Sequence, residues 1–290
     1  MNLRDISGVL RPGQWVKNLI LFAGIIFSEN IQNPEMLAKV LAAFTLFCSL
    51  SSVGYIINDI VDRKQDSQHP HKANRPVASG RLKIRSAVML GSLLLIVSLL
   101  GSCLLNPTFS VVLLAYLSLS VAYSLLFKHI VIIDVMSIAL GFVLRAVAGV
   151  VVINVDISAW LIVCTILLAL FLGFGKRRHE LVLLEAEASD HRQILTEYSL
   201  TFLDQMIAVV TASTVVAYAF YTLSPEVSQK LGTKYMALTI PFVLYGIFRY
   251  LYLIHQKEQG GSPAKTLLTD KPILIDIFLW LIAAILILYL

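Results

Sequence analysis

The chain has 290 residues, of which 58% are hydrophobic and 14% are charged, and its formal net charge is +5 at pH 7. Soluble globular proteins carry about a quarter charged residues, so the composition excludes that class and predicts a polytopic membrane protein. The three cysteines, Cys48, Cys103 and Cys164, lie inside apolar runs without metal-ligand spacing. We therefore expect neither a disulfide framework nor a zinc site.

Hydrophobic runs long enough to cross a bilayer follow one another along the whole chain. We predict one all-α integral membrane domain, residues 1–290, built as a bundle of about nine transmembrane helices. The first run is short and needs to tilt or to begin earlier. The predicted spans are 16–30, 37–57, 86–105, 108–127, 130–152, 158–174, 202–222, 235–254 and 273–290.

Basic residues concentrate on one side of this topology. With the N-terminus in the cytoplasm, nearly all lysines and arginines fall on the cytoplasmic side, and only Lys39, Lys230 and Lys234 lie near the other. This bias satisfies the positive-inside rule and predicts a multi-pass protein of the cytoplasmic (inner) membrane. The basic excess also suits anionic lipid headgroups, and we expect no nucleic-acid partner.

Three aspartates, Asp59, Asp62 and Asp66, follow the second predicted span at positions i, i+3 and i+7. On a continuous helix they would share one face, rotated by about 20–60° from one another. Three carboxylates this close repel one another unless a cation lies between them. Oxygen-only ligands favour Mg²⁺, which completes its shell with water and substrate phosphate. We predict a cytoplasmic Mg²⁺ site at these carboxylates.

Cationic side chains accompany the acidic motif. Lys72 and Arg75 follow it directly, and Lys17 precedes it in the first predicted span. Such side chains bind phosphate groups as point charges or as planar forks. The predicted site is therefore one for a magnesium-bound diphosphate.

Two charges lie inside the fifth predicted span, Asp134 near its cytoplasmic end and Arg145 about three turns deeper. Charges in spans usually face a cavity or a partner. Asp134 is a candidate contact for an incoming cation. The sequence leaves the role of Arg145 open between structure and function.

The motif Asn58–Asp66, followed by Lys72-Ala73-Asn74-Arg75-Pro76, resembles the first signature of the UbiA superfamily of intramembrane prenyltransferases. Further stretches resemble its decaprenyl-phosphate phosphoribosyltransferase branch, namely 11–18, 141–146, 175–181, 248–252 and 267–272. The resemblance implies nine transmembrane helices around a central cavity that opens to the cytoplasm.

The chain differs from the prenyltransferase pattern at one motif, and this difference bears on whether the donor is a prenyl diphosphate or a phosphoribosyl pyrophosphate. Prenyltransferases of the family usually carry a second DxxxD motif between the sixth and seventh helices, and no DxxxD follows Asp66 here. The corresponding segment offers Lys176 and Arg177, which suit direct binding of phosphates. These cations also fit the simpler interpretation that they only mark the cytoplasmic side. Whether a second metal binds near Glu180 and Glu187 stays open.

The resemblance implies Mg²⁺-dependent transfer of a 5-phosphoribosyl group from phosphoribosyl pyrophosphate to a polyprenyl phosphate of decaprenyl type, with release of diphosphate. The product would serve the synthesis of an arabinose donor for cell-envelope glycans. In this interpretation Asp59, Asp62, Asp66 and Asn58 form the catalytic centre. Asn58 would orient the metal shell or a ribose hydroxyl, and Asp134 would contact ribose hydroxyls or an incoming cation. The substrate is bound by Lys17, Lys72, Arg75, Lys176, Arg177 and Asp134.

Two alternatives compete with this function. One is an aromatic polyprenyltransferase, which uses a prenyl diphosphate donor and an acceptor such as 4-hydroxybenzoate. The first motif fits this function equally well, but the absence of a second DxxxD motif from this chain argues against it. A transporter would distribute ionisable residues across the bilayer. In this chain they gather at one face. The length of the lipid chain and the oligomeric state do not follow from the sequence.

Overall fold

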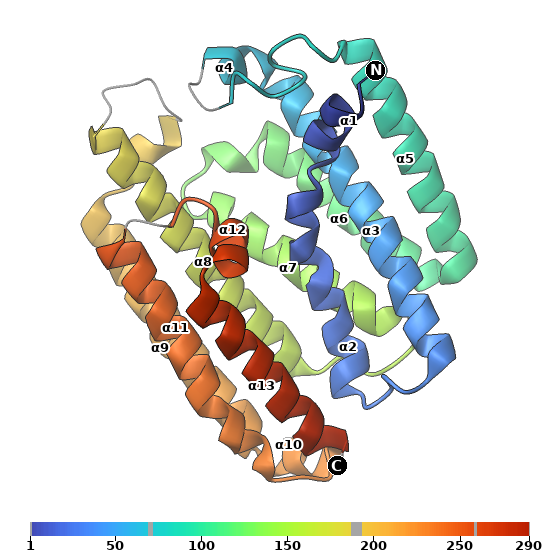
Figure 1. Ribbon diagram of the computed structural model, residues 1–290, viewed down its shortest axis with the longest axis vertical. Coiled ribbons are helices and arrows are strands. Elements are labelled where there is room, and N and C mark those ends of the chain that lie inside the picture. The colour runs from blue at the N-terminus through green and yellow to red at the C-terminus, as the bar shows by residue number, and fades with distance from the viewer. Residues whose placement is uncertain (1, 69–71, 187–192, 258–259, 290) are drawn as a thin grey trace. The chain divides into compact units, whose positions relative to one another are not determined.

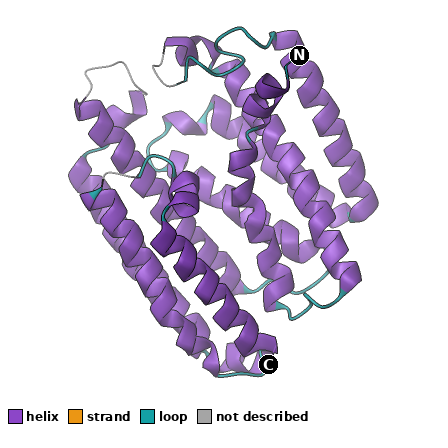
Figure 2. Ribbon diagram, in the orientation of Figure 1, coloured by secondary structure: helices purple, strands orange, loops and turns teal. Residues whose placement is uncertain are grey.

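Helices make up every regular element in the computed structural model, which describes residues 2–68, 72–186, 193–257 and 260–289 (Figures 1 and 2). The Cα positions cluster into two compact units. The first comprises residues 1–25 and 31–156, and the second comprises residues 26–30 and 157–290.

The first unit contains the N-terminal helices and four long ones. Its α-helices are α1 (Leu3–Leu10), α2 (Phe22–Phe27, of which residues 22–25 belong to this unit), α3 (Pro34–Val61), α4 (Arg63–Gln68), α5 (Ile84–Leu105), α6 (Pro107–Leu125) and α7 (Ile133–Val151). Two 3-10 helices complete it, η1 (Pro12–Leu21) and η2 (Phe127–His129). Helix α3 packs against both α5 and α6, and α6 packs against α7.

The second unit contains four long helices and their connections. Its α-helices are α8 (Ala159–Ala186), α9 (Leu200–Leu223), α10 (Pro225–Lys230), α11 (Ile240–Gln256), α12 (Pro263–Thr269) and α13 (Lys271–Tyr289). Its 3-10 helices are η3 (Gln193–Glu197) and η4 (Tyr235–Thr239). Helices α8 and α9 pack together along their length, and α11 packs against α13.

Asparagine–proline pairs begin two of the long helices. The side-chain oxygen of Asn33 accepts hydrogen bonds from the backbone amides of Glu35 and Met36, and Asn106 caps α6 in the same way. An asparagine cap satisfies amides that have no partner within the helix, and proline suits the first helical position because it lacks an amide proton. These pairs therefore separate consecutive spans.

Eight helices of the described residues are long and apolar enough to cross a membrane. They correspond to the second to ninth predicted spans. The first predicted span, 16–30, is divided between η1 and α2. A 3-10 helix rises about 2.0 Å per residue, so η1 covers about 20 Å with few residues. The count of nine spans stays a prediction.

Candidate active site

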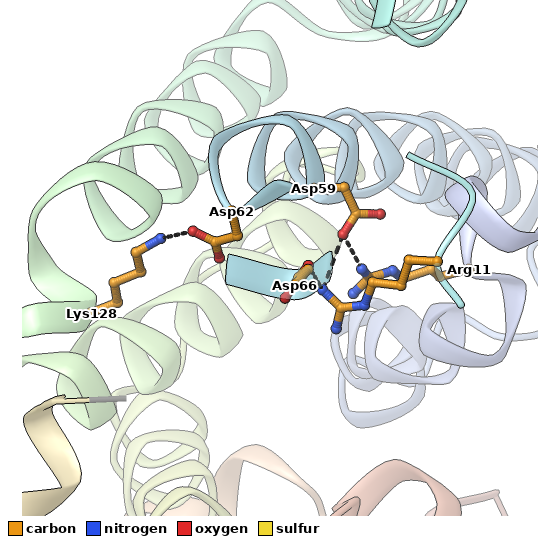
Figure 3. Close-up of polar contacts among 6 residues, drawn as sticks. Arg11, Asp59, Asp62, Asp66 and Lys128 are labelled. Atoms are coloured by element: carbon orange, nitrogen blue, oxygen red, sulfur yellow. Dashed lines mark hydrogen bonds and ion pairs between the residues drawn. The ribbon is translucent and has the colours of Figure 1, made fainter. Parts of the chain in front are cut away.

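The acidic motif lies where α3 ends. Asp59 is in the last turn of α3 and 1% exposed, Asp62 is the residue that ends the helix, and Asp66 lies in α4 and is 4% exposed. The expected continuous helix is therefore wrong, because the helical path breaks at Asp62. The side chain of Asp62 points away from those of the other two aspartates (Figure 3).

Two arginines from outside α3 compensate the charges of Asp59 and Asp66. Arg11 forms an ion pair with Asp59 Oδ1. Arg75 Nη1 donates to Asp59 Oδ1 at 3.2 Å and to Asp66 Oδ2 at 2.6 Å. One guanidinium thus bridges two buried carboxylates that would otherwise repel each other (Figure 3).

Arg11 reaches Asp59 from the junction between α1 and η1. It has a φ of 53°, in the left-handed region, where the chain turns from one helix into the other. Its guanidinium also lies 5.2 Å from the centre of the Tyr55 ring. Burial lowers the pKa of Arg11, and the neighbouring Asp59 carboxylate opposes that shift. In the sequence, Arg11 was only part of the stretch 11–18 that resembles the family, and it was not a predicted site residue. The structure places it beside Asp59.

Asp62 has a separate partner, Lys128, which is 5% exposed and lies in η2 between α6 and α7. The two form an ion pair (Figure 3). Sequence reasoning missed this lysine as a site residue. Its signal was weak but present, because Lys128 and His129 are the polar side chains of a short connection between two apolar spans.

The donor set at Asp59 and Asp66 fits a magnesium ion. Asp59 Oδ2 is buried and has no hydrogen-bond partner, so one carboxylate oxygen remains available for a cation. No group of three His, Cys, Asp or Glu side chains in the described ranges has metal-binding geometry. Magnesium at phosphate sites is commonly held by one or two carboxylates and the substrate's own phosphates. Asp59 and Asp66 meet that requirement, whereas Asp62 faces Lys128.

The remaining predicted residues of the first unit lie on elements around α3. Asn58 is half-buried one residue before Asp59, Lys17 is half-buried on η1, and Lys72 is half-buried in the segment after α4. Asp134 is fully buried in the first turn of α7, where the helix dipole favours a negative charge.

The two predicted cations of the second unit have a carboxylate partner on their own helix. Arg177 is 1% exposed and pairs with Glu180, and Lys176 Nζ lies 3.5 Å from Glu180 Oε1. Arg178 Nε donates to Asp204 Oδ1 at 2.6 Å, which links α8 to α9. Glu187, considered for a second metal, lies outside the described residues.

The fold and the site define a class, an α-helical membrane protein with a buried acidic motif bracketed by arginines at the end of a span. The sequence model of the UbiA prenyltransferase family matches residues 19–282. The chain belongs to this family and is a membrane-embedded transferase.

Relatives extend over nearly the whole chain. It is 30% identical to decaprenyl-phosphate phosphoribosyltransferase of Corynebacterium glutamicum, covering 99% of this chain and 88% of the relative. It is also 30% identical to the enzyme of that name from Mycolicibacterium smegmatis, covering 95% and 91%. A UbiA homologue from Archaeoglobus fulgidus bound to GPP and Mg²⁺ has a similar fold, with a TM-score of 0.73 at 19% identity. That match covers 99% of this chain and 100% of the other.

Proposed function

We propose that this protein transfers a 5-phosphoribosyl group from phosphoribosyl pyrophosphate to a polyprenyl phosphate and releases diphosphate. The observation that carries the proposal is its similarity, along nearly the whole chain, to relatives named decaprenyl-phosphate phosphoribosyltransferase. The missing second DxxxD motif supports the same choice over a prenyl diphosphate donor. The product would enter the synthesis of an arabinose donor for cell-envelope glycans.

Asp59 and Asp66 are the residues that would hold Mg²⁺, whereas Asp62, the third predicted ligand, pairs with Lys128. When bound, the ion would stabilise the charge that develops on the departing diphosphate. Arg11 and Arg75 already lie against Asp59, so their guanidinium groups are close enough to contact phosphate oxygens beside the carboxylates. Lys17, Lys72, Lys176 and Arg177 are the further phosphate contacts in this proposal, and Asn58 and Asp134 the contacts for ribose hydroxyls.

The chemistry needs no general base from the protein. A phosphate oxygen of the lipid attacks the anomeric carbon, a new C–O bond forms, and the bond to diphosphate breaks. The second pKa of a phosphate monoester is about 6, so the attacking oxygen is already anionic near neutral pH. The protein's contribution is positioning and charge stabilisation in a site with little water.

A direct assay tests this function. Purified protein in detergent is incubated with labelled phosphoribosyl pyrophosphate, polyprenyl phosphate and Mg²⁺, and the lipid fraction is analysed for label. A parallel incubation contains a prenyl diphosphate and labelled 4-hydroxybenzoate. We expect label in the lipid only in the first incubation, and loss of that label in excess chelator. A prenylated aromatic product would support the alternative function instead.

A further inference from the structure

A 3-10 helix of ten residues, η1 (Pro12–Leu21), opens the first predicted span. Runs of 3-10 helix longer than three or four residues are uncommon, because their hydrogen-bond geometry is poorer than that of an α-helix. Contacts from other elements must therefore hold this segment in its winding. Side chains three residues apart lie on the same face of a 3-10 helix.

Helix α3 contacts η1 at two positions three residues apart. Trp15 Nε1 donates to Ser52 Oγ at 3.2 Å, and Asn18 Nδ2 donates to Cys48 Sγ at 3.2 Å. Ser52 and Cys48 are one turn apart on α3, so they form one strip. Each three-residue step on an α-helix would rotate the side chain by about 60°, whereas the 3-10 winding keeps Trp15 and Asn18 aligned.

Helix α7 contacts η1 at Asn18, which α3 also contacts, and at the backbone of Leu21. Arg145 Nε donates to Asn18 Oδ1 at 2.7 Å. One turn further along α7, Gly149 packs against Leu21 so closely that a Cβ there would lie 1.9 Å from the Leu21 carbonyl oxygen. Asn18 and Leu21 are again three residues apart. The α7 contacts therefore extend from the Asn18 side chain to the backbone at the end of η1.

Arg145 is itself held firmly, which suits a residue that positions another element. It is 5% exposed, and its Nη1 and Nη2 donate to Gly141 O at 2.8 Å and to Tyr116 Oη at 2.7 Å. The guanidinium also lies 4.7 Å from the Tyr116 ring centre and 5.7 Å from that of Phe47. Its hydrogen-bond acceptors in the described part of the chain are all uncharged, so its role is not that of an ion pair.

We infer that Arg145 is a positioning residue that, together with Gly149, clamps η1 in its 3-10 winding. Arg11 precedes η1 and pairs with Asp59, and Lys17 is the neighbour of Asn18. A change to α-helical winding would shorten η1 by about 0.5 Å per residue and rotate Lys17 relative to Asn18. The clamp therefore sets where Arg11 and Lys17 lie relative to the carboxylates. The consequence for substrate binding rests on the proposed function.

Hydrogen–deuterium exchange tests the clamp without reference to activity. The variants are Arg145→Met, which removes the donors, and Ser98→Ala as a control that removes a buried hydroxyl from α5. We expect amides in peptides covering residues 12–21 to exchange about tenfold faster in Arg145→Met, as loss of one charged hydrogen bond predicts. Peptides from α5 should keep the wild-type rate. In Ser98→Ala, residues 12–21 should exchange as in the wild type.

Two results would overturn the inference. One is wild-type exchange of residues 12–21 in Arg145→Met. The other is equal acceleration along the whole chain, which would assign Arg145 to general stability.

Kinetics test the link to the substrate separately. If the proposed function holds, Arg145→Met should raise KM for phosphoribosyl pyrophosphate more than it lowers kcat. Adding Asn18→Leu to Arg145→Met should then cause a smaller loss than Asn18→Leu causes in the wild type, because the contact between Arg145 and Asn18 is already absent and only the contact with Cys48 is removed. Additive losses would overturn the coupling of Arg145 to Asn18. Wild-type protein without phosphoribosyl transfer would refute the proposed function, while the exchange experiment would still decide the clamp.

Discussion

The two carboxylate oxygens of Asp59 have different surroundings. Two arginines contact its Oδ1, and its Oδ2 is buried without a partner. This combination places Asp59 at the centre of the proposed site, because the same carboxylate meets both the cations and the position open to a metal. Its removal should therefore affect the reaction directly, and the amount of inserted protein reports any effect on the fold.

We predict that Asp59→Ala lowers phosphoribosyl transfer by about a hundredfold or more, as expected for loss of a group that stabilises transition-state charge. The measurement is the rate of label transfer to polyprenyl phosphate, together with the amount of protein inserted in membranes. Asp5→Ala is the matched control, since Asp5 is a carboxylate of α1 that pairs with Arg81 at the surface. Near-normal turnover in Asp59→Ala would refute the metal assignment.

The ion pair of Lys128 and Asp62 gives a second test at the level of residues. Lys128→Met leaves a partly buried carboxylate without its cation, which should cost about 3 kcal/mol of stability. We expect the melting temperature in detergent to fall by several degrees. The double variant Lys128→Met/Asp62→Leu should recover most of the loss, because it removes the unpaired charge. A double variant no more stable than the single one would contradict this account.

The sequence suggested the acidic residues and Arg75 as members of the site, but it did not identify the partners Arg11 and Lys128. Asp59, Asp62 and Asp66 follow from local spacing, which any reader of the sequence can see. The partners Arg11 and Lys128 are 48 and 66 residues away from Asp59 and Asp62. Such pairings depend on how helices pack, and local spacing carries no information about them.

At the level of elements, the sequence predicted where the helices lie better than it predicted helix type and helix breaks. Eight predicted spans correspond to long helices, because hydrophobic length is sufficient to locate them. The break of α3 at Asp62 and the 3-10 winding of η1 both lie at contacts with other elements, Lys128 with Asp62 and Arg145 with Asn18. The interpretation of the sequence treated both segments, the end of α3 and η1, as regular α-helix.

Asp270 joins two helices of the second unit. It accepts from Arg249 Nη2 of α11 at 2.9 Å, and its Oδ1 accepts from the backbone amide of Ile273 in α13 at 3.1 Å. The hydrogen bond from Arg249 lowers the pKa of Asp270. A lowered folded-state pKa means that the ionised carboxylate stabilises the folded protein.

We predict a pH dependence with a defined sign for this contact. The stabilisation should be complete above the unfolded pKa of about 3.9 and lost as the pH falls through the lower folded pKa. Asp270→Asn should therefore lower the melting temperature by a constant amount from about pH 5 to 8, and by less below about pH 4. Melting curves of both proteins in one detergent across this range provide the test. A difference that grows towards acid pH would contradict it.

At the scale of the whole molecule, the distribution of basic residues predicts the orientation in the membrane. The segment between α4 and α5, which contains Ser79, should face the cytoplasm, and α10, which contains Gln229, should face the opposite side. Both side chains are exposed. They are therefore suitable positions for labelling from either side.

The test uses single-cysteine variants, Ser79→Cys and Gln229→Cys, in a background with Cys48, Cys103 and Cys164 replaced by serine. A membrane-impermeant maleimide added to intact spheroplasts should label the Gln229→Cys variant at once and the Ser79→Cys variant only after permeabilisation. The reason is that Lys72, Arg75 and Arg81 surround Ser79 in the sequence and favour retention in the cytoplasm. The reversed pattern would place the carboxylates of α3 on the outer side, away from a cytoplasmic supply of phosphoribosyl pyrophosphate, and would refute the proposed function together with the topology.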